Sequence, residues 1–281
     1  MAGSGVFPKI TGDIIYQGDY NAVQSIVAGV KTTYYGVACS SAQLSGNPTV
    51  TAAQFNSLLT DVDSCIKHQT GSNSGLATRS AGETITYTHI NNLKTYADQS
   101  ETNKSTVFAS TQLSQVANSV TSSRNGAVYP WNSSITHTVQ VDFASANDAN
   151  YFFQSGGYLY STASQTGGSG SGKDPNWATV INAIGGTRKY TLSNWTTGGT
   201  VTIATVGGSG VYSSNYWQLS ATKNSTTRVT LTMTFADAAG GNPNFDENVT
   251  LDITSAVGYY KSADAIVTSI PSGFTNLGTL V

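Results

Sequence analysis

Residues 135–143 read Ile-Thr-His-Thr-Val-Gln-Val-Asp-Phe, and this stretch decides the fold class of the second half of the chain. Apolar and polar side chains alternate through it, with His137 on the apolar side, which indicates a strand with one buried and one solvated face. The same alternation returns at residues 229–235 and 249–254, where threonines occupy the outer face. The sequence after Trp131 therefore predicts antiparallel strands that share one core.

Weaker strand patterns fill the rest of this region, and pairs of glycines separate them as turns. The predicted strands cover residues 158–162, 189–192, 200–205 and 216–221, with short helices at 147–154 and 175–184. Residues 126–281 thus predict an antiparallel β-sandwich domain of about seven or eight strands.

Before residue 125 the apolar residues recur at helical spacing. The pattern predicts a helix over 20–30 with Asp19 as a possible N-cap. A second helix follows the capping box Thr51-Ala-Ala-Gln54 and ends at Gly71. Two more are expected at 88–97, capped by Thr88, and at 113–120. Residues 1–125 therefore predict a mainly helical docking or assembly domain, and the whole chain an α+β fold.

Charged residues make up 10% of the chain, against about 25% in ordinary soluble domains. Serine, threonine, glycine and asparagine take the polar positions instead, which is typical of proteins that work outside cells or inside large assemblies. The first residues, MAGSGVFPKITGDIIYQGDY, have no basic leader, apolar run or cleavage site of a signal peptide. This combination predicts a virion component that is assembled in the host cytoplasm and released by lysis.

The charge pattern argues against nucleic acid, because 13 basic residues are scattered among 15 acidic ones and the net charge is −2. No apolar stretch approaches the ~20 residues that would insert into a membrane. Cys39 and Cys65 are too few for a disulfide framework. They either pair with each other or remain two free buried thiols.

The segment from Gly167 to Lys173 has the glycine and lysine spacing of a phosphate-binding loop. Asp174 stands where that loop needs a Ser or Thr hydroxyl for Mg²⁺, so we expect a plain loop. His68, His89 and His137 lack the spacing of metal ligands. We expect His68 to cap a helix C-terminus and His137 to be a hydrogen-bonded core residue.

Two pairs of carboxylates, Asp246 with Glu247 and Asp142 with Asp148, raise the possibility of glycan cleavage. That chemistry needs two carboxyl groups ~5–9.5 Å apart across a sugar. Neighbouring strand residues point to opposite faces, so Asp246 and Glu247 do not meet this requirement in a strand. No G-x-S-x-G motif with a partner histidine is present. We expect a non-enzymatic protein without catalytic residues, cofactor or metal.

Aromatic residues form the more credible binding surface of the second domain. Their faces stack on sugars, although Tyr and Trp also fill cores and subunit interfaces, and both interpretations remain open here. The candidates for contact with a host surface glycan are Tyr190, Trp195, Tyr212, Tyr216 and Trp217.

Several short motifs are distributed along most of the chain. They are Gly18-Asp-Tyr-Asn21, Thr51-Ala-Ala-Gln-Phe-Asn56, His68-Gln-Thr-Gly71, Ile85-Thr-Tyr-Thr-His-Ile-Asn-Asn92, Trp131-Asn-Ser-Ser-Ile-Thr-His-Thr-Val139, Phe152-Phe-Gln-Ser-Gly-Gly157 and Thr234-Phe-Ala-Asp237. Together they resemble structural proteins of tailed phages of aquatic bacteria, cyanophages especially. The resemblance implies a virion protein without enzymatic activity. It leaves neck, tail, baseplate and fibre as locations.

Four short helices, each with one apolar face, make a thin core for about 110 residues. Neighbouring copies, or other virion proteins, would supply the missing burial. We therefore expect a homo-oligomer, trimer or higher. The predicted interface consists of Tyr20, Val23 and Val27, or of an extended arm that contains Val6, Phe7 and Pro8.

Overall fold

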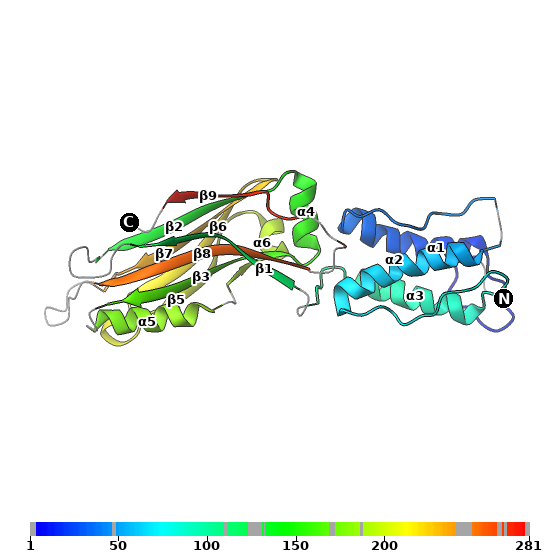
Figure 1. The fold of residues 1–281 in the computed structure, drawn as a ribbon, viewed down its shortest axis with the longest axis horizontal. Coiled ribbons are helices and arrows are strands. Elements are labelled where there is room, and N and C mark those ends of the chain that lie inside the picture. The colour runs from blue at the N-terminus through cyan, green and yellow to red at the C-terminus, as the bar shows by residue number, and fades with distance from the viewer. Residues whose placement is uncertain are drawn as a thin grey trace. The chain divides into compact units, whose positions relative to one another are not determined.

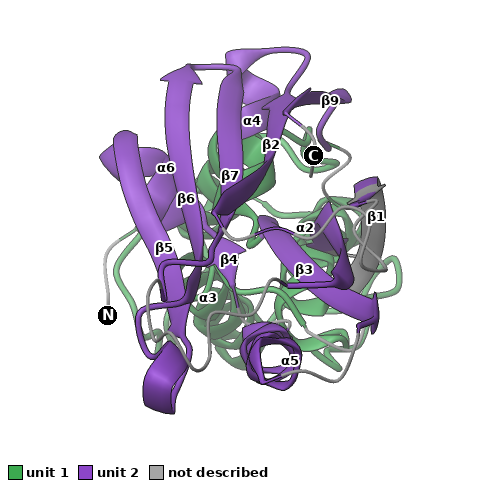
Figure 2. Cartoon of the chain, turned by 90° about the vertical axis from the view of Figure 1, so that its left-hand side faces the viewer, with its two compact units in different colours: residues 1–113, 150–156, 262–269 green, residues 114–149, 157–261, 270–281 purple. Residues whose placement is uncertain are grey.

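The computed structural model describes residues 4–46, 49–108, 112–122, 131, 133–168, 172–185, 188–239, 249–262, 266 and 269–278. The fold is α+β, with helices in the N-terminal region followed by antiparallel sheets (Figure 1). Two compact units divide the chain (Figure 2). The helical unit comprises Met1–Leu113, Asn150–Gly156 and Ser262–Ser269, and the β unit comprises Ser114–Ala149, Gly157–Lys261 and Ile270–Val281. The first boundary thus falls at 113 and not at 125.

The three helices predicted first are present in the helical unit. They are α1 (Gln17–Ala28), which continues into the π-helical turn η1 (Gly29–Tyr34), α2 (Ala52–Thr70) and α3 (Tyr87–Thr102). The capping box at Thr51 is confirmed, and Gly71 ends α2 with a φ of 81°. Helices α1 and α3 begin earlier than expected, after the N-caps Tyr16 and Thr86.

The fourth predicted helix, over 113–120, is wrong. Residues Gln112–Thr121 form strand β1, which pairs with strand β8 (Leu251–Ser262). Valine, threonine and serine make up much of this segment, and these residues favour or tolerate strands. An available strand partner therefore decided the structure where short-range spacing alone was ambiguous.

The helical unit is an internal threefold repeat with a period of 35 residues, which the sequence reasoning missed. Helices α1, α2 and α3 begin at residues 17, 52 and 87, which are 35 positions apart. At each start an aliphatic residue precedes the N-cap, and the third helical residue closes back onto the N-cap amide. The backbone N–H groups of Tyr16, Thr51 and Thr86 donate to the side chains of Asp19, Gln54 and His89, at 2.7, 2.9 and 3.2 Å.

An asparagine lies two positions after each of Asp19, Gln54 and His89, and its side chain binds the backbone of the next repeat. Asn21 receives the N–H of Leu44 at 2.8 Å and donates to its carbonyl at 2.9 Å. Asn56 makes the same two bonds to Arg79, at 2.8 and 2.9 Å. Asn91 binds Lys9 in the same way, at 2.9 and 2.7 Å. Because the third asparagine returns to the first repeat, the three repeats close into a ring.

The three helices run parallel, each preceded by an extended segment that carries the chain back along the unit (Figure 1). Their C-terminal ends meet: Tyr34 Oη lies 2.7 Å from Ser105 Oγ, and the Gln69 side chain donates to Tyr35 Oη and to the Ser100 carbonyl. The core repeats with the same period. Three equivalent sets of buried side chains form it: Tyr20, Phe55 and Ile90; Val23, Leu58 and Leu93; Val27, Val62 and Ala97.

We expect Asn91→Ala to destabilise the helical unit by about 1–3 kcal/mol, because it leaves two polar groups of Lys9 without their partner. Asn92→Ala is the matched control, since Asn92 is the exposed next residue of α3. Helical circular dichroism during urea denaturation measures the effect. Equal midpoints for the two variants would show that the ring closure contributes little.

The β unit contains two antiparallel sheets among the described residues. The five-stranded sheet has the order β5 (Gly199–Gly207), β6 (Tyr216–Ser225), β7 (Arg228–Ala236), β2 (Ser134–Asp142), β9 (Gly273–Gly278). The four-stranded sheet has the order β1, β8 (Leu251–Ser262), β3 (Tyr158–Gly167), β4 (Lys189–Tyr190). The alternation at 135–143 is confirmed, because β2 pairs with β7 from Ser134 with Ala236 to Asp142 with Arg228 and buries every second residue.

Short helices complete the fold. The predicted ones are present as α4 (Ala146–Gln154) and α5 (Lys173–Ile184). Helix α4 spans the boundary between the two units. Two elements were not predicted: helix α6 (Leu192–Thr197) and the 3-10 turn η4 (Gly210–Tyr212). Strand β9 was missed as well, because its sequence, Gly-Phe-Thr-Asn-Leu-Gly, has glycine at both ends and no sustained alternation.

Candidate functional site

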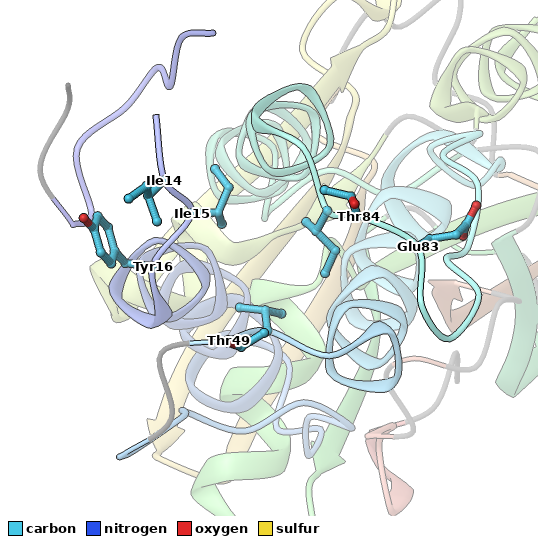
Figure 3. A pocket seen from close by; sticks show the side chains of 8 residues that line it. Ile14, Ile15, Tyr16, Thr49, Glu83 and Thr84 are labelled. Atoms are coloured by element: carbon cyan, nitrogen blue, oxygen red, sulfur yellow. The ribbon is translucent and has the colours of Figure 1, made fainter. Parts of the chain in front are cut away.

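A pocket in the helical unit is the candidate site, and Figure 3 shows it. Its volume is about 340 Å³, near the low end for small-ligand pockets. Isoleucine and valine side chains dominate its wall, and two threonines, a tyrosine and a glutamate add polar groups. The lining residues are Ile14, Ile15, Tyr16, Thr49, Val50, Glu83, Thr84 and Ile85.

The pocket lies where the three repeats meet. Six of its eight lining residues form two sets of equivalent positions 35 residues apart: Ile14, Thr49 and Thr84; Ile15, Val50 and Ile85. All six lie in the extended segments just before the N-caps, so the pocket opens at the end of the unit where the three helices begin. An approximate threefold axis therefore passes through it.

The segment before α1 is held in place by a buried ion pair. Lys9 Nζ lies 2.8 Å from Asp19 Oδ1, and both side chains are fully buried. The same carboxylate accepts the backbone N–H groups of Gly5 and Tyr16, at 2.5 and 2.7 Å. Asp19 thus fixes this segment at three points, and it does so from the first turn of α1, where a negative charge is favourable.

Exposed apolar side chains gather on this fixed segment. Ile10 is 60% exposed, Ile14 56%, Val6 52% and Tyr16 38%, all within eleven consecutive residues. Neighbouring exposed apolar groups of this kind mark interaction surfaces more often than scattered single ones do.

The rim of the pocket is acidic. Glu83 is its one charged lining residue, and its carboxylate accepts the backbone N–H of Ser80. Asp13 occupies the equivalent position of the first repeat, directly before Ile14, and accepts the N–H of Ile10 at 2.9 Å. The arrangement can therefore hold an apolar group in the cavity and a positive charge at its edge.

The predicted interface residues are distributed differently from our expectation. Tyr20, Val23 and Val27 are at most 1% exposed and fill the helical unit's own core, so they offer no surface. The helical faces are covered because the three repeats pack on one another around one core. Val6 is exposed and Phe7 is partly buried against that core.

The predicted glycan-binding aromatics also lie inside. Tyr190, Trp195, Tyr212 and Trp217 are buried in the β unit, and Tyr216 is half-buried. Lys223 Nζ lies 3.9 Å from the centre of the Trp195 ring. Their faces are therefore engaged within the protein, and no open aromatic platform is formed by this set.

Lys173, the lysine of the loop that resembles a phosphate-binding loop, forms an ion pair within the protein. Lys173 Nζ lies 2.9 Å from Asp237 Oδ2, and both side chains are buried. Asp174 accepts the N–H of Thr250 at 3.0 Å and its hydroxyl at 2.7 Å. Residues 169–171 of the loop lie outside the described residues. In this structure Lys173 is therefore a partner of Asp237 inside the β unit.

The three histidines have separate structural partners. His68 Nε2 lies 2.9 Å from the Ser155 carbonyl, and His89 takes part in the capping box of α3. His137 is buried in the β unit, with Nδ1 3.0 Å from Ser255 Oγ and Nε2 2.8 Å from Asn276 Oδ1, as expected for a core residue. Within the described part of the chain, no three His, Cys, Asp or Glu side chains gather to hold a metal ion.

The carboxylates of Asp142 and Asp148 are each engaged by another side chain. Asp142 pairs with the Arg228 guanidinium at 2.6 Å, and Asp148 accepts from Ser145. Asp246 and Glu247 lie outside the described residues. Cys39 and Cys65 are free thiols; Cys65 is buried, which raises its pKa to about 12, whereas Cys39 is only half-buried. No helix in the described ranges has the length and apolar character needed to cross a membrane.

The buried His137 predicts a pH-dependent stability for the β unit. Burial lowers its pKa below the ordinary value of about 6.5, so the unfolded chain takes up the proton more readily. The stability that the neutral His137 side chain contributes to the β unit is therefore fully present above pH 6.5. It is lost as the pH falls through 6.5 toward the pKa of the folded state. Tryptophan fluorescence reports this directly, because Trp131, Trp177, Trp195 and Trp217 all lie in the β unit.

We expect the urea midpoint of this fluorescence transition to fall between pH 7 and pH 5. His137→Gln should flatten that dependence, and His89→Gln, in the helical unit, should leave it unchanged. A slope that survives in His137→Gln would assign the effect to other groups.

No family model, curated protein or solved structure matches this chain. The function of the pocket therefore has to follow from its own geometry and chemistry. The sequence reasoning did not find its lining residues, although the 35-residue period that places Ile15, Val50 and Ile85 at equivalent positions is present in the printed sequence.

Proposed function

We propose that this chain is a non-enzymatic structural protein of a phage virion. It is a compact component of tail, neck, baseplate or fibre, and it docks onto the particle through its helical unit. The low charge and the motifs that resemble virion proteins of tailed phages support this class of function.

The observation that carries the docking role is the set of exposed apolar side chains on residues 6–16, the segment from which Ile14 and Tyr16 line the pocket. Val6, Ile10, Ile14 and Tyr16 are exposed on a segment that the buried Lys9–Asp19 pair holds in one conformation. A surface that is fixed before binding loses less conformational entropy on association than a mobile one. This favours a permanent contact with another protein.

We infer that the β unit is a β-sandwich that projects from the particle. Two contacts between the sheets support face-to-face packing. His137 of β2 meets Ser255 of β8 at 3.0 Å, and the rings of Tyr259 and Phe274 stack with centroids 6.1 Å apart. With its tryptophans in the core, such a unit offers a polar surface rich in serine and threonine.

The partners in this proposal are other virion proteins and other copies of the chain, without nucleic acid or membrane insertion. Several copies per particle remain a prediction. The helical core gives no support for oligomerisation through Tyr20, Val23 and Val27, because it is complete within one chain.

Immunogold labelling of negatively stained virions with antibodies to the purified chain tests the proposal. We expect label at one defined position of every particle. Absence of the chain from purified particles, by labelling and by mass spectrometry, would refute a virion role.

The docking role has its own test, which uses tagged full-length variants expressed during infection. Ile10→Ser should reduce incorporation into particles several-fold. Val211→Ser is the matched control, because Val211 is 58% exposed but lies in the β unit. Loss of incorporation only with Val211→Ser would reverse the assignment of the docking end.

A further inference from the structure

We propose that the pocket on the approximate threefold axis binds a segment of a neighbouring protein that presents one branched aliphatic side chain next to a lysine or arginine. This inference rests on the proposed docking function and names the chemistry of its partner.

The size and wall of the pocket define the aliphatic part. About 340 Å³ suits a small group, and Ile14, Ile15, Val50 and Ile85, which belong to all three repeats, supply an apolar wall. Transfer of an aliphatic side chain from water into such a wall is favourable in proportion to the area buried. Figure 3 shows Ile14 and Ile15 of the segment before α1, and Thr49 of the segment before α2, around the pocket.

The charge at the rim defines the basic part. Glu83 is exposed, and no lysine or arginine of the described chain forms an ion pair with it; its carboxylate accepts only a backbone N–H within its own turn, from Ser80. The other carboxylate at an equivalent position, Asp13, accepts the N–H of Ile10 in the same kind of turn. The turn at Ser80 holds the Glu83 carboxylate at the pocket, and Asp13 directly precedes the lining residue Ile14. An incoming ammonium or guanidinium group is therefore complementary to this edge, and an acidic segment is repelled.

The threefold arrangement limits how the partner enters. The wall comes from extended segments that precede three parallel helices, and the backbone N–H groups of the N-cap residues Tyr16, Thr51 and Thr86 already donate to the side chains of Asp19, Gln54 and His89. These three N-cap amides are therefore engaged within the protein. A phosphate or carboxylate ligand is disfavoured by the negative charge of Glu83 at the pocket.

Three short peptides and the full-length chain test the inference. The probes are acetyl-Gly-Lys-Leu-Lys-Gly-amide, its Glu-Leu-Glu analogue and its Lys-Ser-Lys analogue, and methyl NMR follows the signals of Ile14, Val50 and Ile85. We expect saturable shifts with the Lys-Leu-Lys peptide, at least tenfold weaker binding of the other two, and weaker binding at high salt.

Variants separate the two parts of the site. Glu83→Gln should weaken binding of the Lys-Leu-Lys peptide three- to tenfold. Glu101→Gln, on the exposed last turn of α3, should leave that binding unchanged. Ile14→Ser, at an exposed position, should weaken it as well. Equal binding of the Glu-Leu-Glu peptide, shifts at other methyl groups, or no shift at millimolar peptide would overturn the inference.

Incorporation of variant chains into virions distinguishes failure of the pocket inference from failure of the proposed virion function. If Glu83→Gln and Ile14→Ser chains enter virions as the natural chain does, the pocket is not the docking contact, although the virion role stands. If the chain binds the peptide but is absent from virions, the pocket inference holds as a binding property and the virion role fails.

Discussion

Replacing Asp61 with alanine should lower the free energy of unfolding of the helical unit by about 3–5 kcal/mol, the cost of breaking a buried ion pair. Asp61 is fully buried, and Lys31 Nζ lies 2.6 Å from its Oδ1. The carboxylate also accepts the backbone N–H groups of Ser40 and Ser41 and the hydroxyl of Ser41. The alanine variant leaves a buried ammonium group and two amides without their acceptor.

A surface ion pair of the same unit provides the control. Lys94 and Asp98 are 2.7 Å apart but half of the Asp98 side chain is exposed, so Asp98→Ala should cost under about 1 kcal/mol. Circular dichroism of the helices during urea denaturation compares the two. If Asp61→Ala does not fold, Lys31→Met tests the same pair, because it removes the charge and keeps the apolar stem. Similar losses for Asp61→Ala and Asp98→Ala would contradict the prediction.

The same pair predicts how the helical unit responds to acid. Burial tends to raise the pKa of Asp61, but the hydrogen bonds from Lys31 and Ser41 outweigh it and hold the pKa below the ordinary value. The pair therefore stabilises the fold above the ordinary aspartate pKa of about 3.9. That contribution is lost as the pH falls below this value through the folded-state pKa. In Asp61→Asn the helical transition should lose that part of its acid dependence.

The elements that sequence predicted well are those in which local signals agree. Helix α2 has a capping box, one apolar stripe and a C-terminal glycine, and each was found where expected. Strand β2 alternates over nine residues and pairs in the expected phase with β7. The segment 112–121 had no cap and no long alternation, and pairing with β8, which lies more than a hundred residues away in sequence, decided its structure.

The candidate site could not be predicted by looking for chemical groups. Our search favoured aromatics such as Trp195, and in a chain with few charges these belong to the core. The pocket instead depends on the closing contact of the ring, in which Asn91 reaches back to Lys9 across 82 positions. Comparison of the chain with itself at a shift of 35 would have found the three asparagines and, with them, the residues before each helix.

Replacing Trp217 with alanine should destabilise the β unit by about 3–5 kcal/mol, because it removes a large side chain from a filled core. Trp217 lies on β6, between β5 and β7, where it is opposite Val206 and Phe235, and it is fully buried. Tyr216→Ala is the matched control. Its side chain leaves the opposite face of the same strand and is half-buried, so we expect a loss of about 1 kcal/mol.

This comparison also separates the core role of the aromatics from a sugar-binding role. A tryptophan that served as an open platform for a glycan would leave stability nearly unchanged when removed and would abolish binding on a glycan array. A core tryptophan gives the reverse result, with a large shift of the fluorescence midpoint and no selective loss of a ligand. The remaining three tryptophans still report the unfolding transition of the β unit. An unchanged midpoint in Trp217→Ala would return Trp217 to the surface and revive the glycan-binding interpretation.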